Sequence, residues 1–74
     1  MPLTMLGSGK NAVITGCRAK DKTMKFLEGL GLVPGTQVSV VSENNGNIIL
    51  SVRGSRIAIN RGIAQLLMVE GYGR

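Results

Sequence analysis

A Gly-Ser-Gly-Lys segment at residues 7–10 is the first part of the sequence whose residue types could bind a ligand, in this case a phosphate group. A phosphate-binding loop also needs a glycine where Thr4 stands, and a serine or threonine where Asn11 follows the lysine. Such a loop leads into a helix, whereas residues 12–15 are rich in β-branched side chains and indicate a strand. A Gly-x-Gly-x-x-Ala dinucleotide pattern at residues 7–12 fails for the same reason, so we expect a turn and no nucleotide site.

The other polar side chains give little evidence of a metal site or a catalytic site. The sequence has 0 His, 1 Cys and 4 acidic residues, although histidine is the commonest metal ligand and a frequent general base. Asp21 and Glu28 would lie about 10 Å apart along one helix, too far for a single ion to bridge. A serine or threonine nucleophile would have no obvious base beside it. We therefore expect no enzyme, no metal site and no cofactor. Cys17 is interpreted as a half-buried structural residue, with a reactive or intermolecular thiol as the alternative.

Length and composition place the chain among small globular proteins. Its 74 residues are 43% hydrophobic and 18% charged, which suits one domain and leaves too little chain to enclose a large pocket. The single cysteine excludes a secreted miniprotein held by internal disulfides and favours a reducing compartment. The sequence lacks the run of about 18 apolar residues that a membrane span needs, and residues 1–6 do not resemble a signal peptide. We expect a cytoplasmic protein that meets a membrane only through a partner.

A surplus of positive charge restricts the partners without choosing among them. Nine Lys and Arg residues against four Asp and Glu residues give a net charge of +5, which suits nucleic acid, an anionic membrane surface or an acidic protein. Binders of single-stranded nucleic acid also need aromatic side chains on which bases stack. Here the aromatic residues are Phe26, expected in the core, and Tyr72, expected in a frayed tail. Nucleic acid is therefore the less favoured partner. The one basic cluster, which could equally be a solvated helix face, comprises Arg18, Lys20, Lys22 and Lys25.

A short helix is predicted after the first strand. Asp21 is the expected N-cap residue, and apolar residues then recur at the spacing of one helix face. Gly29 and Gly31 are expected to end the helix, one of them in a left-handed conformation. The expected apolar face consists of Met24, Phe26, Leu27 and Leu30.

The rest of the sequence indicates short strands joined by tight turns. Asn-Gly at residues 45–46 and the Arg-Gly-Ser segment at residues 53–55 are the expected hairpin turns. Asn60 is expected to cap one helical turn over residues 61–66. The predicted strands are residues 12–15, 37–42, 48–52, 57–60 and 68–69.

These elements predict a mainly β fold. Because so few residues must cover both ends of the apolar sheet face, the sheet is expected to curl into a small five-stranded SH3-like barrel. One short helix would lie between the first two strands, and a helical turn would precede the last. We expect a single domain over residues 1–74, with residues 71–74 as the frayed tail.

The order and spacing of several motifs resemble the FeoA family. The strongest block is residues 27–38, Leu-Glu-Gly-Leu-Gly-Leu-Val-Pro-Gly-Thr-Gln-Val, which is similar to the family's Leu-x-x-Met-Gly-Leu-x-Pro-Gly-x-x-Val. The chain departs from the family in having Lys22 and Lys25 where arginine is usual, Leu30 where methionine is common, and a short hairpin at residues 44–47. The other matching positions are Leu3, Leu6, Gly9, Ala12, Ile14, Gly16, Val52, Gly54, Ile57, Ala58, Ile59, Ala64, Leu67 and Val69.

This resemblance implies an SH3-like protein of bacterial ferrous iron uptake. Family members act with FeoB, a membrane iron transporter that has a cytosolic G-protein-like domain. The implied role is assembly or regulation of that transporter through protein–protein contacts, without catalysis by the small protein. Transition-metal binding is a description attached to the family. The alternatives that stay open are a basic SH3-like module that binds nucleic acid and an oligomeric scaffold; weak self-association is compatible with each.

The helix and the glycine-rich corner that follows it form the expected partner surface. The alternative for this corner, residues 27–35, is purely architectural, because a helix must stop here and the chain must turn into a strand. In the functional interpretation, lysines meet an acidic surface and apolar residues at the helix exit add contact area. The expected partner-binding residues are Lys20, Lys22, Lys25, Leu30, Leu32 and Val33.

Overall fold

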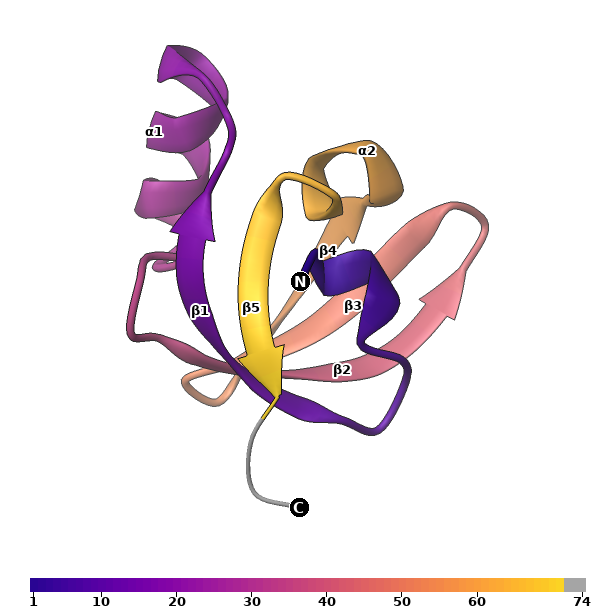
Figure 1. Ribbon diagram of the computed structural model, residues 1–74. Coiled ribbons are helices and arrows are strands. Elements are labelled where there is room, and N and C mark those ends of the chain that lie inside the picture. Colours follow the sequence, from indigo (N-terminus) through magenta and orange to yellow (C-terminus); the bar gives the residue numbers. More distant parts are fainter. Residues whose placement is uncertain (72–74) are drawn as a thin grey trace.

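The structure is a computed structural model that describes residues 1–71. Within these residues, five antiparallel strands form one sheet in the order β4-β3-β2-β1-β5 (Figure 1). Between the strands and before them lie a 3-10 helix (η1) and two α-helices (α1 and α2). The bounds are η1 Leu3–Met5, β1 Asn11–Cys17, α1 Asp21–Gly29, β2 Gln37–Asn44, β3 Asn47–Val52, β4 Ser55–Asn60, α2 Arg61–Ala64 and β5 Leu67–Gly71.

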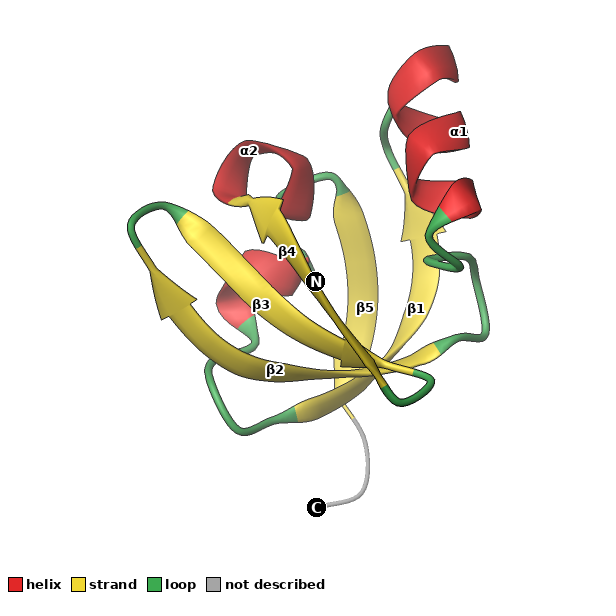
Figure 2. Cartoon of the chain, turned by 180° about the vertical axis from the view of Figure 1, so that it is seen from behind, coloured by secondary structure: helices red, strands yellow, loops and turns green. Residues whose placement is uncertain are grey.

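Two irregularities in strand pairing help the sheet to curl. The β1–β5 register shifts between Ile14 and Gly16, and the β2–β3 register shifts between Val40 and Ser42. Such bulges bend a strand and increase its twist. Figure 2 shows the result from behind: β2, β3 and β4 form one side of a barrel, and β1 and β5 close the other. The predicted curled five-stranded sheet is confirmed.

The core lies inside this barrel and is built from alternating strand residues. On β3, Ile48, Leu50 and Val52 are buried while the residues between them are half-buried. Leu3 of η1 joins this core and is 1% exposed. Each such leucine or isoleucine contributes about 1.5–3 kcal/mol when it leaves water. The N-terminal segment is therefore anchored to the core through Leu3.

Turn chemistry follows the sequence closely. Asn45 and Gly46 have φ angles of 48° and 81°, and Arg53 and Gly54 have φ angles of 51° and 84°. Two successive positive φ angles define the two-residue hairpin turn that matches the twist of paired strands. Asn60 caps α2 as predicted, because its Oδ1 accepts a hydrogen bond from the Ile63 amide at 2.8 Å. Helix α2 is shorter than expected.

Three local expectations are wrong. Lys20, not Asp21, is the N-cap residue of α1, and it makes no side-chain capping bond. Asp21 is instead the first helical residue. Its negative carboxylate there is stabilised by the positive end of the helix dipole. Phe26 is 52% exposed rather than buried, because successive helix residues are about 100° apart and Leu27 takes the inward direction. Gly71 belongs to β5; the remaining tail, residues 72–74, lies outside the described residues.

Candidate functional site

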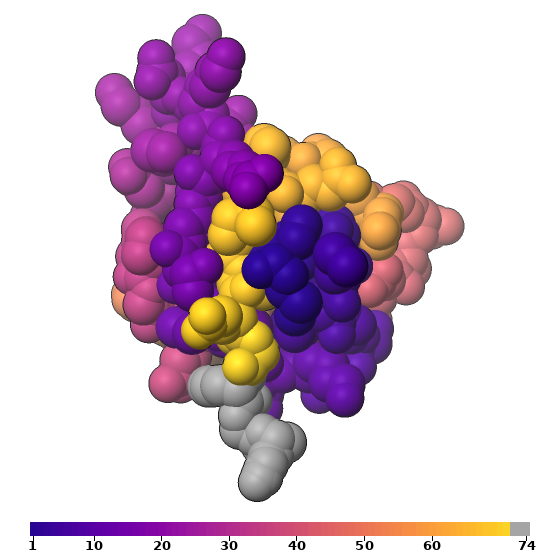
Figure 3. Space-filling model, viewed as in Figure 1, coloured from indigo at the N-terminus to yellow at the C-terminus, as the bar shows by residue number. Residues whose placement is uncertain are grey.

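Helix α1 stands away from the barrel. Figures 1 and 3 show it rising beyond one end of the strands, and most of its residues are exposed. Leu27 is its buried residue, and buried Ala19 and Leu32 flank the helix on either side. The helix is therefore held mainly by its inner face, and the other faces are available to a partner.

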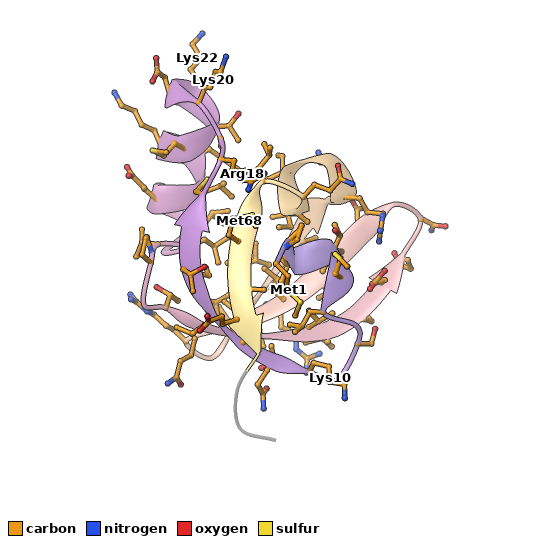
Figure 4. The ribbon with its side chains drawn as sticks, viewed as in Figure 1. Met1, Lys10, Arg18, Lys20, Lys22 and Met68 are labelled. Carbon is orange, nitrogen blue, oxygen red and sulfur yellow. The ribbon has the colours of Figure 1, made fainter. Side chains whose placement is uncertain are left out.

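The predicted lysines lie together on the exposed part of this helix. Lys20, Lys22 and Lys25 are all exposed, and Figure 4 shows Lys20 and Lys22 at the free end, pointing away from the barrel. Within residues 1–71, the salt bridge that forms joins Arg61 to Glu43 at 2.9 Å. The three lysines are thus not neutralised by a salt bridge within the described chain, and their charge can attract an acidic surface.

A stripe of one lysine and two apolar residues runs along one side of α1. Lys22, Phe26 and Leu30 follow one another at intervals of four residues, so they lie on one side of α1. Phe26 is 52% exposed and Leu30 is half-buried against the core. A half-exposed aromatic ring on a protruding helix is a common feature of protein interfaces. The sequence pattern placed Phe26 in the core, although its position next to Leu27 turns it off the inner face of the helix.

A cavity of about 200 Å³ lies on another side of the helix. Its lining is mostly apolar, and Glu28 is its one charged residue. The volume suits one apolar side chain of a partner rather than a large ligand. The lining residues are Cys17, Met24, Leu27, Glu28, Leu32, Val33 and Pro34.

The structure separates the three predicted apolar contact residues. Leu30 and Val33 are half-buried and border the surface. Leu32 is 2% exposed and belongs to the core, so the prediction that it forms an exposed patch is wrong. The chain turns tightly here, because Val33 N donates to Gly31 O at 3.0 Å; at this turn the Leu32 side chain is buried and Val33 is half-buried. Leu32 reaches the surface only as part of the cavity lining.

Backbone hydrogen bonds hold the helix exit in a fixed shape. Gly31 has a φ of +84°, and its carbonyl accepts a bond from the Thr36 hydroxyl at 2.9 Å. Leu32 N donates to Leu27 O at 2.9 Å, which ends the helix in the manner expected of a left-handed glycine. Gly35 N then donates to Ile14 O at 2.7 Å and ties the exit to β1. The cavity wall is therefore presented on a rigid corner.

The rejected ligand sites remain without support. Gly7 and Gly9 have φ angles of 89° and 80°, and Gly9 N donates to Val40 O at 2.7 Å, so that amide serves the sheet rather than a phosphate. Cys17 is half-buried and free, and its Sγ accepts a bond from Ala19 N at 3.3 Å. Among the described residues, no three His, Cys, Asp or Glu side chains are grouped as metal ligands. None of the helices in that part of the chain is long and apolar enough to cross a membrane.

Comparisons with known proteins point to one family. The family model described as "FeoA domain" matches residues 1–71. Over 69 residues the chain is 35% identical to the "Putative Fe(2+) transport protein A" of Methanocaldococcus jannaschii, covering 93% of this chain and 84% of that protein. A crystal structure of an iron uptake regulatory protein, FeoA, has a TM-score of 0.90 at 30% identity and covers 97% of each chain.

A zinc complex of the Stenotrophomonas maltophilia FeoA has a TM-score of 0.83 at 25% identity, covering 95% of this chain and 89% of that one. It is described as a procaryotic SH3 domain protein, so the expected SH3-like fold is confirmed. The sequence match extends over nearly all of the described residues, and the names of the relatives agree on iron uptake. The chain therefore belongs to the FeoA family, which is associated with ferrous iron transport.

Proposed function

We propose that this protein is a cytoplasmic, non-catalytic accessory protein of ferrous iron uptake, which binds the cytosolic side of a FeoB-like membrane transporter. Membership of the FeoA family and the Fe(2+) transport name of the archaeal relative support the pathway. One structural observation supports binding through a protein surface: α1 protrudes next to an apolar cavity, with an exposed Phe26 and with lysines that form no salt bridge within residues 1–71.

In this proposal the charge and the cavity have different tasks. Lys20, Lys22 and Lys25 attract an acidic surface and orient the approaching partner, which mainly raises the association rate. An apolar partner side chain then enters the cavity beside Val33, and removal of its surface from water slows dissociation. Occupation of this site assembles or regulates the transporter, and the small protein itself carries out no chemical step.

The first experiment measures whether the immobilised protein retains a membrane transporter. Detergent-solubilised membranes from cells that express a FeoB-like protein are passed over it, followed by washes at moderate and high salt. We expect a large GTP-binding membrane protein to be retained at both salt concentrations, with less retained at high salt because exposed charge pairs are screened.

A charge reversal on α1 tests the role of the lysines without unfolding the helix. Lys22 lies in the first helical turn, where a carboxylate is favoured by the helix dipole, so Lys22→Glu should leave stability unchanged or raise it slightly. We expect the affinity for the transporter to fall roughly fivefold at low salt. Lys10→Glu is the matched control, because Lys10 lies at the opposite end of the barrel (Figure 4) and carries the same charge change.

Two results would contradict the proposal. If Lys22→Glu and Lys10→Glu weaken retention equally, the net charge and not α1 governs binding. If no membrane protein is retained and nucleic acid is recovered only at moderate salt, the basic nucleic-acid module becomes the better interpretation.

A further inference from the structure

The two edges of the sheet differ in how they are covered. At the β5 edge, Met1 O accepts a hydrogen bond from Val69 N at 2.7 Å, and the Met1 amino group donates to Val69 O at 2.9 Å. Pro2 also forms a bridge with Met68. At the other edge, β4 pairs with β3 alone, and no second strand of residues 1–71 lies against it. Figure 2 shows β4 on the near side of the molecule.

Hairpin geometry identifies the backbone groups that face away from the sheet. Val52 and Ser55 flank the two-residue turn, so they form a hydrogen-bonded pair. Hydrogen-bonded pairs alternate with non-bonded pairs along an antiparallel ladder. The bond from Arg61 N to Gly46 O, at 3.0 Å, continues the same alternation beyond the strand. The N–H and C=O groups of Arg56 and Ala58 therefore point outward from the β4 edge.

The β4 edge is regular enough to accept another strand. Every residue from Ser55 to Asn60 pairs with β3, with no register shift, whereas β1 and β2 each contain one. The strand contains no proline. Arg56 and Ala58 are exposed, and Ile57 between them is half-buried. A straight, accessible edge of this kind is a template for strand pairing.

Charge determines which strand can pair there. Arg56 is exposed on β4 and Arg53 lies in the adjacent turn, and neither forms a salt bridge within residues 1–71. Arg61, at the far end of the strand, is already paired with Glu43 at 2.9 Å. An edge arginine disfavours a second copy of a chain whose net charge is +5, but it favours a carboxylate placed opposite it.

We propose that the β4 edge binds an extended acidic segment of a partner protein by strand addition. The outward N–H and C=O groups of Arg56 and Ala58 form the main-chain hydrogen bonds, and a carboxylate of the added strand lies opposite Arg56. This mode of recognition takes its affinity from the backbone and its specificity from alternate side chains. Arg56 and Ala58 belong neither to α1 nor to the lining of its cavity, so the inference does not depend on the proposed transporter contact.

Amide hydrogen exchange of the intact protein tests this inference directly. In the free protein, the amides of Ile57 and Ile59 should exchange slowly because they donate to β3, whereas those of Arg56 and Ala58 should exchange rapidly. The probe is a blocked six-residue peptide of alternating glutamate and valine. At saturation we expect it to slow exchange at Arg56 and Ala58 at least about tenfold. A lysine–valine peptide and a fully N-methylated glutamate–valine peptide should have no such effect.

Two variants separate the backbone contribution from the charge contribution. Ala58→Pro removes one outward N–H at a position where an edge strand tolerates proline, and it should weaken binding of the acidic peptide while the fold is kept. Arg56→Glu should weaken binding about fivefold at low salt and shift the preference toward the lysine–valine peptide. Lys10→Glu, with the same change of charge, should leave binding nearly unchanged.

Three outcomes would overturn the proposal. The N-methylated peptide could bind as well as its parent, which would exclude main-chain pairing. The acidic peptide could bind without slowing exchange at Arg56 and Ala58, which would place it elsewhere. Protection of these two amides could instead rise with protein concentration in the absence of peptide, which would make the occupant a second copy of this chain.

Discussion

Strand β3 has six residues and helix α1 has nine, yet β3 buries three side chains and α1 buries one. On β3, every second residue enters the core, so the strand cannot be removed without opening the barrel. On α1, Leu27 enters the core while Phe26 beside it is 52% exposed. The strand contributes to folding, whereas most of the helix surface is not needed for folding and is free to contact another molecule.

The same difference extends to the ends of the two elements. The β3 strand is bounded by two-residue turns whose φ angles are all positive, and it pairs with strands on both sides. The N-cap residue of helix α1, Lys20, makes no side-chain capping bond, although Asn60 supplies one to the four-residue helix α2. A helix with an uncapped start and one buried residue should open locally before the barrel does.

The largest expected effect comes from the barrel. Leu50 is fully buried between Val40 and Ile57 in the ladder, so Leu50→Ala should lower the free energy of unfolding by about 2–5 kcal/mol. That is a large part of the total for a domain of this size, which is about 4–11 kcal/mol. Denaturant titration measures the loss. Ile49→Ala is the control on the outer face of the same strand, and an equal loss there would contradict the proposed division between core and surface.

An intermediate effect is expected where α1 meets the barrel. Leu27 is 1% exposed and also lines the cavity of about 200 Å³, so Leu27→Ala enlarges an existing void and removes the main anchor of the helix. We expect a loss of about 2 kcal/mol that is concentrated in α1. Amide exchange in α1 should quicken about 30-fold, with a smaller change in β3. Equal acceleration in both elements would show that helix and barrel open as one unit.

The sequence predicted the parts of the fold that depend on local chemistry. Asn45, Gly46 and Gly54 marked the hairpin turns, and Asn60 marked the start of α2. A left-handed end of α1 was predicted at Gly29 or Gly31, and the structure has it at Gly31. These residues act through their own φ angles or through a bond to a near neighbour, so their effect is visible without tertiary structure. The resemblance of residues 27–38 to the FeoA family then indicated how these strands and helices assemble, namely as an SH3-like barrel.

The candidate site was less predictable because it depends on which side of each element faces the barrel. The lysines were found correctly as exposed charges, since a lysine is rarely buried. Phe26 was assigned to the core and Leu32 to the surface, and the structure reverses both. Both residues are hydrophobic; only the packing of Leu27 and the turn after Gly31 decide which one meets solvent. The uncovered β4 edge likewise depends on strand order, which no local pattern encodes.

The smallest effect on stability is expected at the residue that best separates folding from binding. Phe26→Gln exchanges an exposed ring for a good helix former, so the free energy of unfolding should change by no more than about 0.5 kcal/mol. Retention of the transporter should nevertheless fall several-fold, because aromatic side chains dominate many interfaces. Thermal unfolding and membrane-protein retention are measured on the same sample. A folded Phe26→Gln protein that retains the transporter as well as the parent would remove the stripe of Lys22, Phe26 and Leu30 from the interface. The cavity beside Val33 would then be the remaining apolar contact, and the lysines would contribute attraction without a neighbouring ring.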